Sequence, residues 1–201
     1  MRKLVTVTFV TLDGVMQAPG GPDEDDSGGF QSGGWSFNYW DDMMNESMGE
    51  TFAKHPDLLL GRKTYDIFNG YWPNHADEPG ADNLNNAKKY VVSRTLDKVD
   101  WNNSTLIKGD VVKEITRLKQ QDGPELQVHG SGNLIQTLLK HNLVDEMKTL
   151  IFPVALGNGK RLFGSDIDPT GFKLLNSKIS TTGVIIATYE QAGTLKTGSF
   201  A

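Results

Sequence analysis

The segment Leu58–Tyr65, with the sequence LLLGRKTY, constrains the fold of this chain most strongly. Three consecutive leucines without alternation predict a strand that is buried on both faces, as in a parallel sheet covered by helices. Gly61 then permits a sharp turn and the close approach of a ligand. Arg62 supplies a permanent cation, and Thr64 lies where the first turn of a helix favours an anion. The segment therefore predicts a phosphate-facing corner.

Two more strands run into polar turns. One spans 89–94 and ends at Ser93-Arg94, and the other spans 125–129 and leads into the sequence GSGN at 130–133. Ligands of open α/β sheets bind outside the carboxyl ends of the strands, so three neighbouring strands would place the three turns at one edge. A single Gly-x-Gly is a weak signal. The three turns together favour a nucleotide with more than one phosphate, and Arg62 and Arg94 suit a pyrophosphate and a 2′-phosphate. NADP(H) is the natural candidate.

The remaining pattern predicts an α/β fold in one domain over 1–192, followed by a flexible tail at 193–201. The sheet is expected to be mostly parallel and to finish with antiparallel strands, because the last three strands have little helix between them. We expect strands at 4–12, 57–60, 89–94, 105–108, 125–129, 146–154, 172–179 and 184–190, and helices at 41–54, 62–68, 111–121 and from the 130–133 turn to about 141.

Composition excludes several classes of protein. The chain has no cysteine, which removes disulfide scaffolds, thiolate zinc sites and cysteine nucleophiles. No His/Asp/Glu spacing suggests a metal. The net charge of −5 argues against nucleic acid and anionic membranes as main partners, although a nucleotide needs only local positive charge. No apolar window reaches the length of a membrane span, so we expect a cytoplasmic protein.

A glycine-rich loop with an acidic run, 18–34, precedes the aromatic segment 35–40 and a helix whose first turns carry three carboxylates. Loops this long are often lids or binding loops, with a mobile surface excursion as the alternative. His129, at a strand end, is interpreted as structural, with a ligand contact as the alternative.

Five motifs in this order resemble the dihydrofolate-reductase-like superfamily. They are Leu12-Asp13-Gly14-Val15, Leu60-Gly61-Arg62-Lys63-Thr64-Tyr65, Val92-Ser93-Arg94, Val128-His129-Gly130-Ser131-Gly132 and Phe152-Pro153-Val154-Ala155-Leu156-Gly157. The branch that they resemble contains the C-terminal reductase domain of the riboflavin-biosynthesis deaminase–reductase, and the match spans about 2–190. The resemblance implies a three-layer fold, NADPH as cofactor, hydride transfer to a pyrimidine- or pteridine-like ring, and a homodimer.

The resemblance also implies roles for particular residues. Those expected to bind the cofactor are Leu12, Gly14, Gly61, Arg62, Thr64, Ser93, Arg94, Gly130, Ser131, Gly132 and Asn133. Folate reductases place one acidic residue early in the first helix, and Asp41, Asp42 and Glu46 all qualify as the catalytic acid. The alternative is that they are ordinary first-turn acids of a helix.

The substrate is less constrained than the cofactor. Trp35, Tyr39 and Trp40 are candidates for stacking on a planar ring, with a core role as the alternative. We expect no deaminase half and no second phosphate cradle beyond Lys160-Arg161. Two other functions stay open: a nucleotide-binding protein without turnover, and a reductase of unrelated carbonyl compounds.

Overall fold

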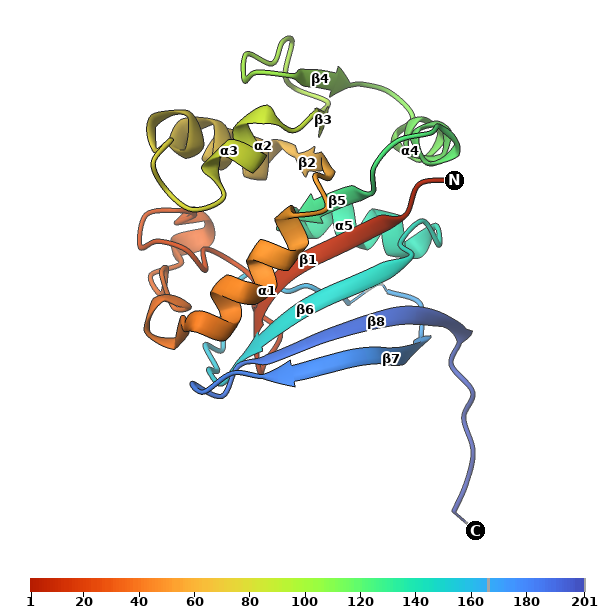
Figure 1. Ribbon diagram of the computed structural model, residues 1–201. Coiled ribbons are helices and arrows are strands. Elements are labelled where there is room, and N and C mark those ends of the chain that lie inside the picture. The colour runs from red at the N-terminus through yellow and green to blue at the C-terminus, as the bar shows by residue number, and fades with distance from the viewer. Residues whose placement is uncertain (166, 201) are drawn as a thin grey trace.

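A computed structural model describes residues 1–165 and 167–200. Its centre is a sheet of eight strands in the order β4-β3-β2-β5-β1-β6-β8-β7 (Figure 1). The strands are β1 (Leu4–Thr11), β2 (Asp57–Gly61), β3 (Lys89–Val92), β4 (Ser104–Ile107), β5 (Leu126–His129), β6 (Glu146–Phe152), β7 (Thr170–Ile179) and β8 (Ile185–Thr194). The first six strands pair in parallel, whereas β8 is antiparallel to both β6 and β7. The predicted mixed sheet is confirmed.

Helices cover the two faces of the sheet and give three layers. Side chains of α4 and α5 share one core cluster with Leu59, whereas α2 and α3 pack with Leu58 and Leu60 on the opposite face. The leucine run of β2 is therefore buried from both sides, as its lack of alternation predicts. The helices are α1 (Asp42–Phe52), α2 (Arg62–Tyr71), α3 (Ala81–Asn86), α4 (Val111–Gln120) and α5 (Gly132–Lys140), with short 3-10 turns at Ser27–Gly29, Phe37–Tyr39 and Trp72–Asn74.

The C-terminal ribbon is longer than the sequence pattern indicates. β8 continues to Thr194, two residues past the expected end of the domain, because it pairs along its length with β7. Residues 191–194 contain a single apolar side chain, Ala192, so no alternation marks this extension. In residues 1–165 and 167–200, no helix has both the length and the apolar content to cross a membrane.

Candidate functional site

The three polar turns predicted from the sequence lie side by side. β3, β2 and β5 are consecutive, parallel strands, so the turns that follow Gly61, Val92 and His129 emerge at one edge of the sheet. A cavity of about 1640 Å³ opens at this edge and is lined by residues of all three turns. The juxtaposition expected from the sequence is present, and the cavity is large enough for a dinucleotide together with a second ligand.

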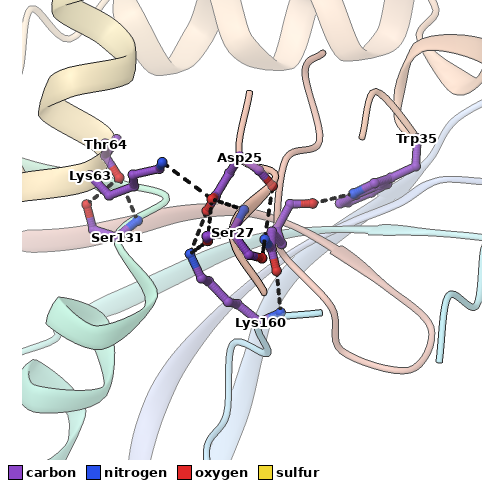
Figure 2. Close-up of polar contacts among 8 residues, drawn as sticks. Asp25, Ser27, Trp35, Lys63, Thr64, Ser131 and Lys160 are labelled. Atoms are coloured by element: carbon purple, nitrogen blue, oxygen red, sulfur yellow. Dashed lines mark hydrogen bonds and ion pairs between the residues drawn. The ribbon is translucent and has the colours of Figure 1, made fainter. Parts of the chain in front are cut away.

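Hydrogen bonds join the start of α2 to the turn after β5. The Ser131 hydroxyl accepts from the Gly61 N–H at 2.9 Å and donates to the Thr64 hydroxyl at 2.9 Å, and the Ser131 N–H donates to the same Thr64 oxygen at 3.0 Å. Figure 2 shows Thr64 and Ser131 facing each other. Gly130 adopts a φ of +53°, and a Cβ there would lie 3.3 Å from the Thr64 hydroxyl. These residues hold the two turns together.

Both helices that begin at this corner lack a side-chain cap. Gly61, which has no side chain, precedes α2. Ser131 precedes α5, and its hydroxyl accepts no hydrogen bond from the first turn of that helix. By contrast, Asp41 caps α1 and Asp110 caps α4 with a carboxylate. Uncapped first turns leave backbone N–H groups available, and the helix dipole favours an anion there. α3 also lines the cavity and lacks a side-chain cap, but Asp82 in its first turn disfavours an anion there. α2 and α5, which have no acidic residue in their first turns, are therefore the helix starts suited to phosphate.

Five cationic side chains line the cavity: Arg62, Lys63, Arg94, Lys160 and Arg161. Four of them form ion pairs. Arg62 binds Asp66 and also donates to the Thr95 hydroxyl at 2.9 Å. Arg94 is exposed and forms no hydrogen bond or ion pair with the residues that the structure describes. Of the five cations, Arg94 is thus the one left free to meet a ligand's charge.

Three more of the residues expected to bind the cofactor lie at the cavity. Gly132 and Asn133 line the cavity, and so does Ser93. The Ser93 hydroxyl accepts from the N–H groups of Thr95 and Leu96 at 3.2 and 3.0 Å, so it shapes the turn that presents Arg94.

The part of the loop after β1 that lines the cavity lies further along the chain than expected. Leu12 is 67% exposed and Gly14 forms a turn with a φ of +82°, and neither lines the cavity. The segment from Met16 to Gly20 lines it instead. A Cβ on Gly132 would lie 3.0 Å from the Met16 sulfur, so the loop after β1 packs directly on the start of α5.

The 18–34 loop is tied to the site through Asp25. The Asp25 carboxylate forms ion pairs with Lys160 at 2.6 Å and with Lys63, next to the α2 start, at 3.5 Å (Figure 2). Burial alone would raise the pKa of Asp25, but hydrogen bonds from Lys160 and Ser27 outweigh it and lower the pKa to about 2. The carboxylate is therefore charged at neutral pH, and it anchors the loop across the cavity.

A second anchor comes from Gln17. Its amide nitrogen donates to the carbonyls of Asp25 and Ser27, both at 2.9 Å, and its amide oxygen accepts from the Lys160 N–H at 3.0 Å. Its backbone carbonyl accepts from the Trp35 indole at 2.7 Å. The loop is therefore an ordered cover in this structure rather than a loose excursion.

Replacing Asp25 by asparagine should loosen this cover. The substitution removes the charge that pairs with Lys63 and Lys160, and we expect amide hydrogen exchange in 18–34 to accelerate by about tenfold. Hydrogen–deuterium exchange followed by mass spectrometry measures this. Asp26→Asn is the matched control, because Asp26 is exposed and pairs with neither lysine. Equal exchange in the two variants would contradict the role of Asp25.

One face of α1, made of Asn45, Met48, Gly49 and Phe52, lines the part of the cavity away from the three polar turns. Asp42 and Glu46 are exposed and do not line the cavity. Asp41 lies at the start of α1, where its carboxylate accepts from the Thr181 N–H at 2.9 Å and from the Thr181 hydroxyl at 2.8 Å. The structure therefore brings none of the three expected acids into the cavity.

Of the three aromatic residues expected to stack on a substrate ring, one lines the cavity and two pack against Phe152. Trp35 is buried with its ring edge-on to Phe152 at 5.2 Å, and Tyr39 also packs against Phe152. Trp35 therefore belongs to the core, and Tyr39 is partly buried against it. Trp40 lines the cavity, where its ring lies 5.7 Å from that of Phe9.

Sequence reasoning missed Asn45, Lys63, Glu24 and Asp25 as cavity residues. A signal for Asn45 was present, because Asn45, Met48, Gly49 and Phe52 follow the spacing of one helix face. No local pattern pointed to Asp25, since it belongs to an acidic run in which every member looks alike.

His129 lies in the cavity wall between aromatic rings. Its imidazole stacks on Phe52 at 5.6 Å, and its Nε2 lies 3.1 Å from the Gln127 amide oxygen. The Gln127 nitrogen already donates to the Thr51 carbonyl and to Glu125, so its oxygen is the acceptor and His129 Nε2 carries the proton. Burial, helped by the Lys148 charge, lowers the pKa of His129 to about 4.

The buried imidazole should make stability depend on pH. Between about pH 6.5 and 4 the unfolded chain binds a proton at His129 and the folded chain does not, so the free energy of unfolding falls by about 2–3 kcal/mol as the pH is lowered through this window. Urea unfolding at several pH values measures this. His129→Gln should flatten the profile, whereas His141→Gln, at an exposed position, should leave it as in the parent chain. A profile unchanged in His129→Gln would refute the assignment.

Comparisons with known proteins agree with this architecture. Residues 2–186 match the family model described as the RibD C-terminal domain. The chain is 30% identical over 198 residues to YyaP of Bacillus subtilis, with 96% of each chain covered. It is 25% identical over 180 residues to YwjB of the same organism, with 88% of this chain and 91% of YwjB covered.

Solved structures with the same fold include a riboflavin biosynthesis protein from Shewanella sp. PV-4, with a TM-score of 0.65, 23% identity, and 95% and 99% of the two chains covered. Dihydrofolate reductase from Enterococcus faecalis, complexed with NADP(H), has a TM-score of 0.60, 13% identity, and 94% and 96% covered. A pyrimidine reductase-like protein from Corynebacterium diphtheriae has a TM-score of 0.61, 12% identity, and 94% and 92% covered. Because the family model matches residues 2–186 of 201, this chain belongs to the RibD C-terminal domain family, and it has the dihydrofolate-reductase-like fold.

Proposed function

We propose that this protein is an NADPH-dependent reductase of a pyrimidine- or pteridine-like heterocycle. The observation that carries the proposal is the shared edge of β3, β2 and β5, where two uncapped helices and the free cation of Arg94 border one cavity. The family match supports the class of reaction, and one structural neighbour is a reductase complexed with NADP(H).

The residues at this edge fit a dinucleotide phosphate. The starts of α2 and α5 suit the pyrophosphate, because Gly61 and Gly130 allow the backbone to approach closely. Arg94 suits the 2′-phosphate, since its guanidinium is exposed at the cavity and lacks a protein partner in the part of the chain that the structure describes. Asp110 caps α4 with a negative charge and bounds the phosphate region on that side.

NADPH, when bound, supplies a hydride, and the chain provides orientation and exclusion of water. Phe9, Trp40, Met48 and Phe52 present apolar surface for a planar ring. The 18–34 loop covers the cavity through Asp25. Its Glu24 also lines the cavity, and burial raises the pKa of this carboxyl against the hydrogen bonds from the N–H groups of Gly20 and Gly21. The proton that accompanies the hydride would come from Glu24 or from water.

Cofactor binding is the first test. Trp40 and Trp72 line the cavity, so bound NADPH should quench tryptophan fluorescence and raise the melting temperature. NADPH oxidation, followed with a panel of pyrimidine and pteridine compounds, then tests turnover. Absence of both binding signals would refute the proposal. The homodimer and the cytoplasmic location stay predictions, the first to be measured by light scattering.

A second function is favoured by one observation. None of Asp41, Asp42 and Glu46 lines the cavity, so the face of α1 that lines the cavity carries no acid. A protein that binds NADP(H) without turning over a substrate would show the binding signals and no NADPH oxidation with any member of the panel.

A further inference from the structure

Asn45 is the polar side chain that α1 contributes to an otherwise apolar wall. Its neighbours in this wall are Phe9, Trp40, Met48 and Phe52. Asn45 is exposed although it lies on the cavity lining, so its amide can reach a ligand there. It occupies the part of the helix where a carboxylate was expected.

One hydrogen bond fixes which end of the amide faces outward. The Trp40 indole nitrogen donates to Oδ1 of Asn45 at 2.6 Å. An indole nitrogen can only donate, so the accepting atom must be the amide oxygen rather than the nitrogen. Trp40 is itself packed against the ring of Phe9 on β1. The indole thereby fixes the Asn45 oxygen on the Trp40 side and uses one of its lone pairs. The orientation of the amide does not depend on an arbitrary choice between two similar atoms.

The amide nitrogen of Asn45 is left with its two hydrogens. It makes no hydrogen bond with any residue in 1–165 or 167–200 that would occupy them. A nitrogen with two free hydrogens recognises an acceptor on the ligand, such as a carbonyl oxygen. A carboxylate at this position would do the reverse, because it accepts and favours a protonated, amidine-like ring edge.

The other carboxylates of the lining do not supply that acceptor on α1. Glu24 and Asp25 belong to the 18–34 loop, where Asp25 is paired with two lysines, and Asp110 caps α4. The α1 part of the wall therefore offers the Asn45 donor and apolar surface.

We propose that Asn45, held by Trp40, selects heterocycles that carry a ring carbonyl, of the uracil or lactam type, against heterocycles with an amidine edge. This inference rests on the proposed reductase function and names the substrate class of the same cavity. Asn45 is a specificity-determining residue in this scheme, and Trp40 is a positioning residue.

The test uses two ligands with the same bicyclic skeleton, pteridine-2,4-dione and 2,4-diaminopteridine, titrated into the protein with and without NADPH. The parent chain should bind the dione about tenfold more tightly than the diamine. Asn45→Asp keeps the acceptor for Trp40 and replaces the donor by a carboxylate, so it should reverse the preference. Trp40→Phe keeps an aromatic ring but removes the indole donor, so the Asn45 amide can rotate and present either its nitrogen or its oxygen. The preference for the dione should then shrink toward equality.

Glu46→Gln is the matched control, because Glu46 neighbours Asn45 on α1 but does not line the cavity, and it should keep the parent preference. Melting temperature and NADPH affinity, measured on every variant, identify any that fails to fold. If the parent chain binds NADPH but prefers the diamine, binds neither pteridine, or keeps its preference in Asn45→Asp, the Asn45 assignment is overturned. Failure to bind NADPH contradicts the proposed function instead, and the pteridine preference of the unloaded protein still tests Asn45.

Discussion

Replacing Arg94 by alanine is expected to weaken NADPH binding by about 10–100-fold and to leave NADH binding within about twofold of the parent value. Arg94 lies in the turn after β3, lines the cavity and has no ion-pair partner among residues 1–165 and 167–200. In the proposed function, a charge-assisted, bidentate contact between Arg94 and the 2′-phosphate would form with NADPH and is impossible with NADH, which has no 2′-phosphate. The two cofactors should therefore respond differently to the substitution.

Fluorescence titration of both cofactors at two salt concentrations measures this effect. The salt dependence of NADPH binding should become shallower in Arg94→Ala, because a screened charge contact has been removed. Arg117→Ala is the control, since Arg117 is exposed on α4, pairs with Glu114 and does not line the cavity. If Arg94→Ala weakens both cofactors equally, Arg94 does not read the 2′-phosphate.

Replacing Lys89 by methionine should lower the free energy of unfolding by about 3–5 kcal/mol. The Lys89 side chain is fully buried at the start of β3. Its ammonium group donates to the carbonyls of Asn85, Ala87 and Asn102 at 2.9, 2.9 and 3.0 Å, and it lies 4.1 Å from the ring centre of Trp101. Methionine fills most of the volume but leaves these buried carbonyls without their donor and removes the cation–π contact.

Urea denaturation gives the size of this loss. Lys88→Met makes the same chemical change at the adjacent, exposed position, and it should alter stability by less than about 0.5 kcal/mol. If Lys89→Met also lowers the free energy of unfolding by less than about 0.5 kcal/mol, the three carbonyls find other partners and Lys89 does not stabilise the segments on either side of β3. Because Lys89 lies at the start of β3, away from the cations that line the cavity, the Lys89→Met protein that remains folded should still bind NADPH.

Much of the fold was predictable because it depends on short-range patterns. The leucine run of β2 has no alternation, and in the structure Leu58 and Leu60 face one helical layer while Leu59 faces the other. Turn residues after β2, β3 and β5 are polar or glycine, and parallel pairing alone is enough to gather them at one edge. The C-terminal end of β8 was harder to predict, because Thr194 is held in the strand by its pairing with β7 and no local sequence pattern marks it.

The substrate side could not be predicted in the same way. Asp41, Asp42 and Glu46 lie within two turns of one helix, and only the docking of α1 on the sheet decides which face meets the cavity. That face carries Asn45, whose helical neighbours at three and four residues also line the wall. Capping chemistry accounts for Asp41, because a carboxylate before the first turn stabilises the helix wherever the helix is placed.

The sequence by itself determined the buried strands, the glycine turns and the cations that follow them, since these features act between residues close together in the chain. Tertiary structure alone decided that Asp25 bridges Lys63 and Lys160, that Lys89 is buried while Lys88 is exposed, and that Trp40 orients the amide of Asn45. The physical reason is that a side chain's burial and partners depend on how distant elements pack. Identical residue types in neighbouring positions therefore acquire different roles only when the layers of the fold come together.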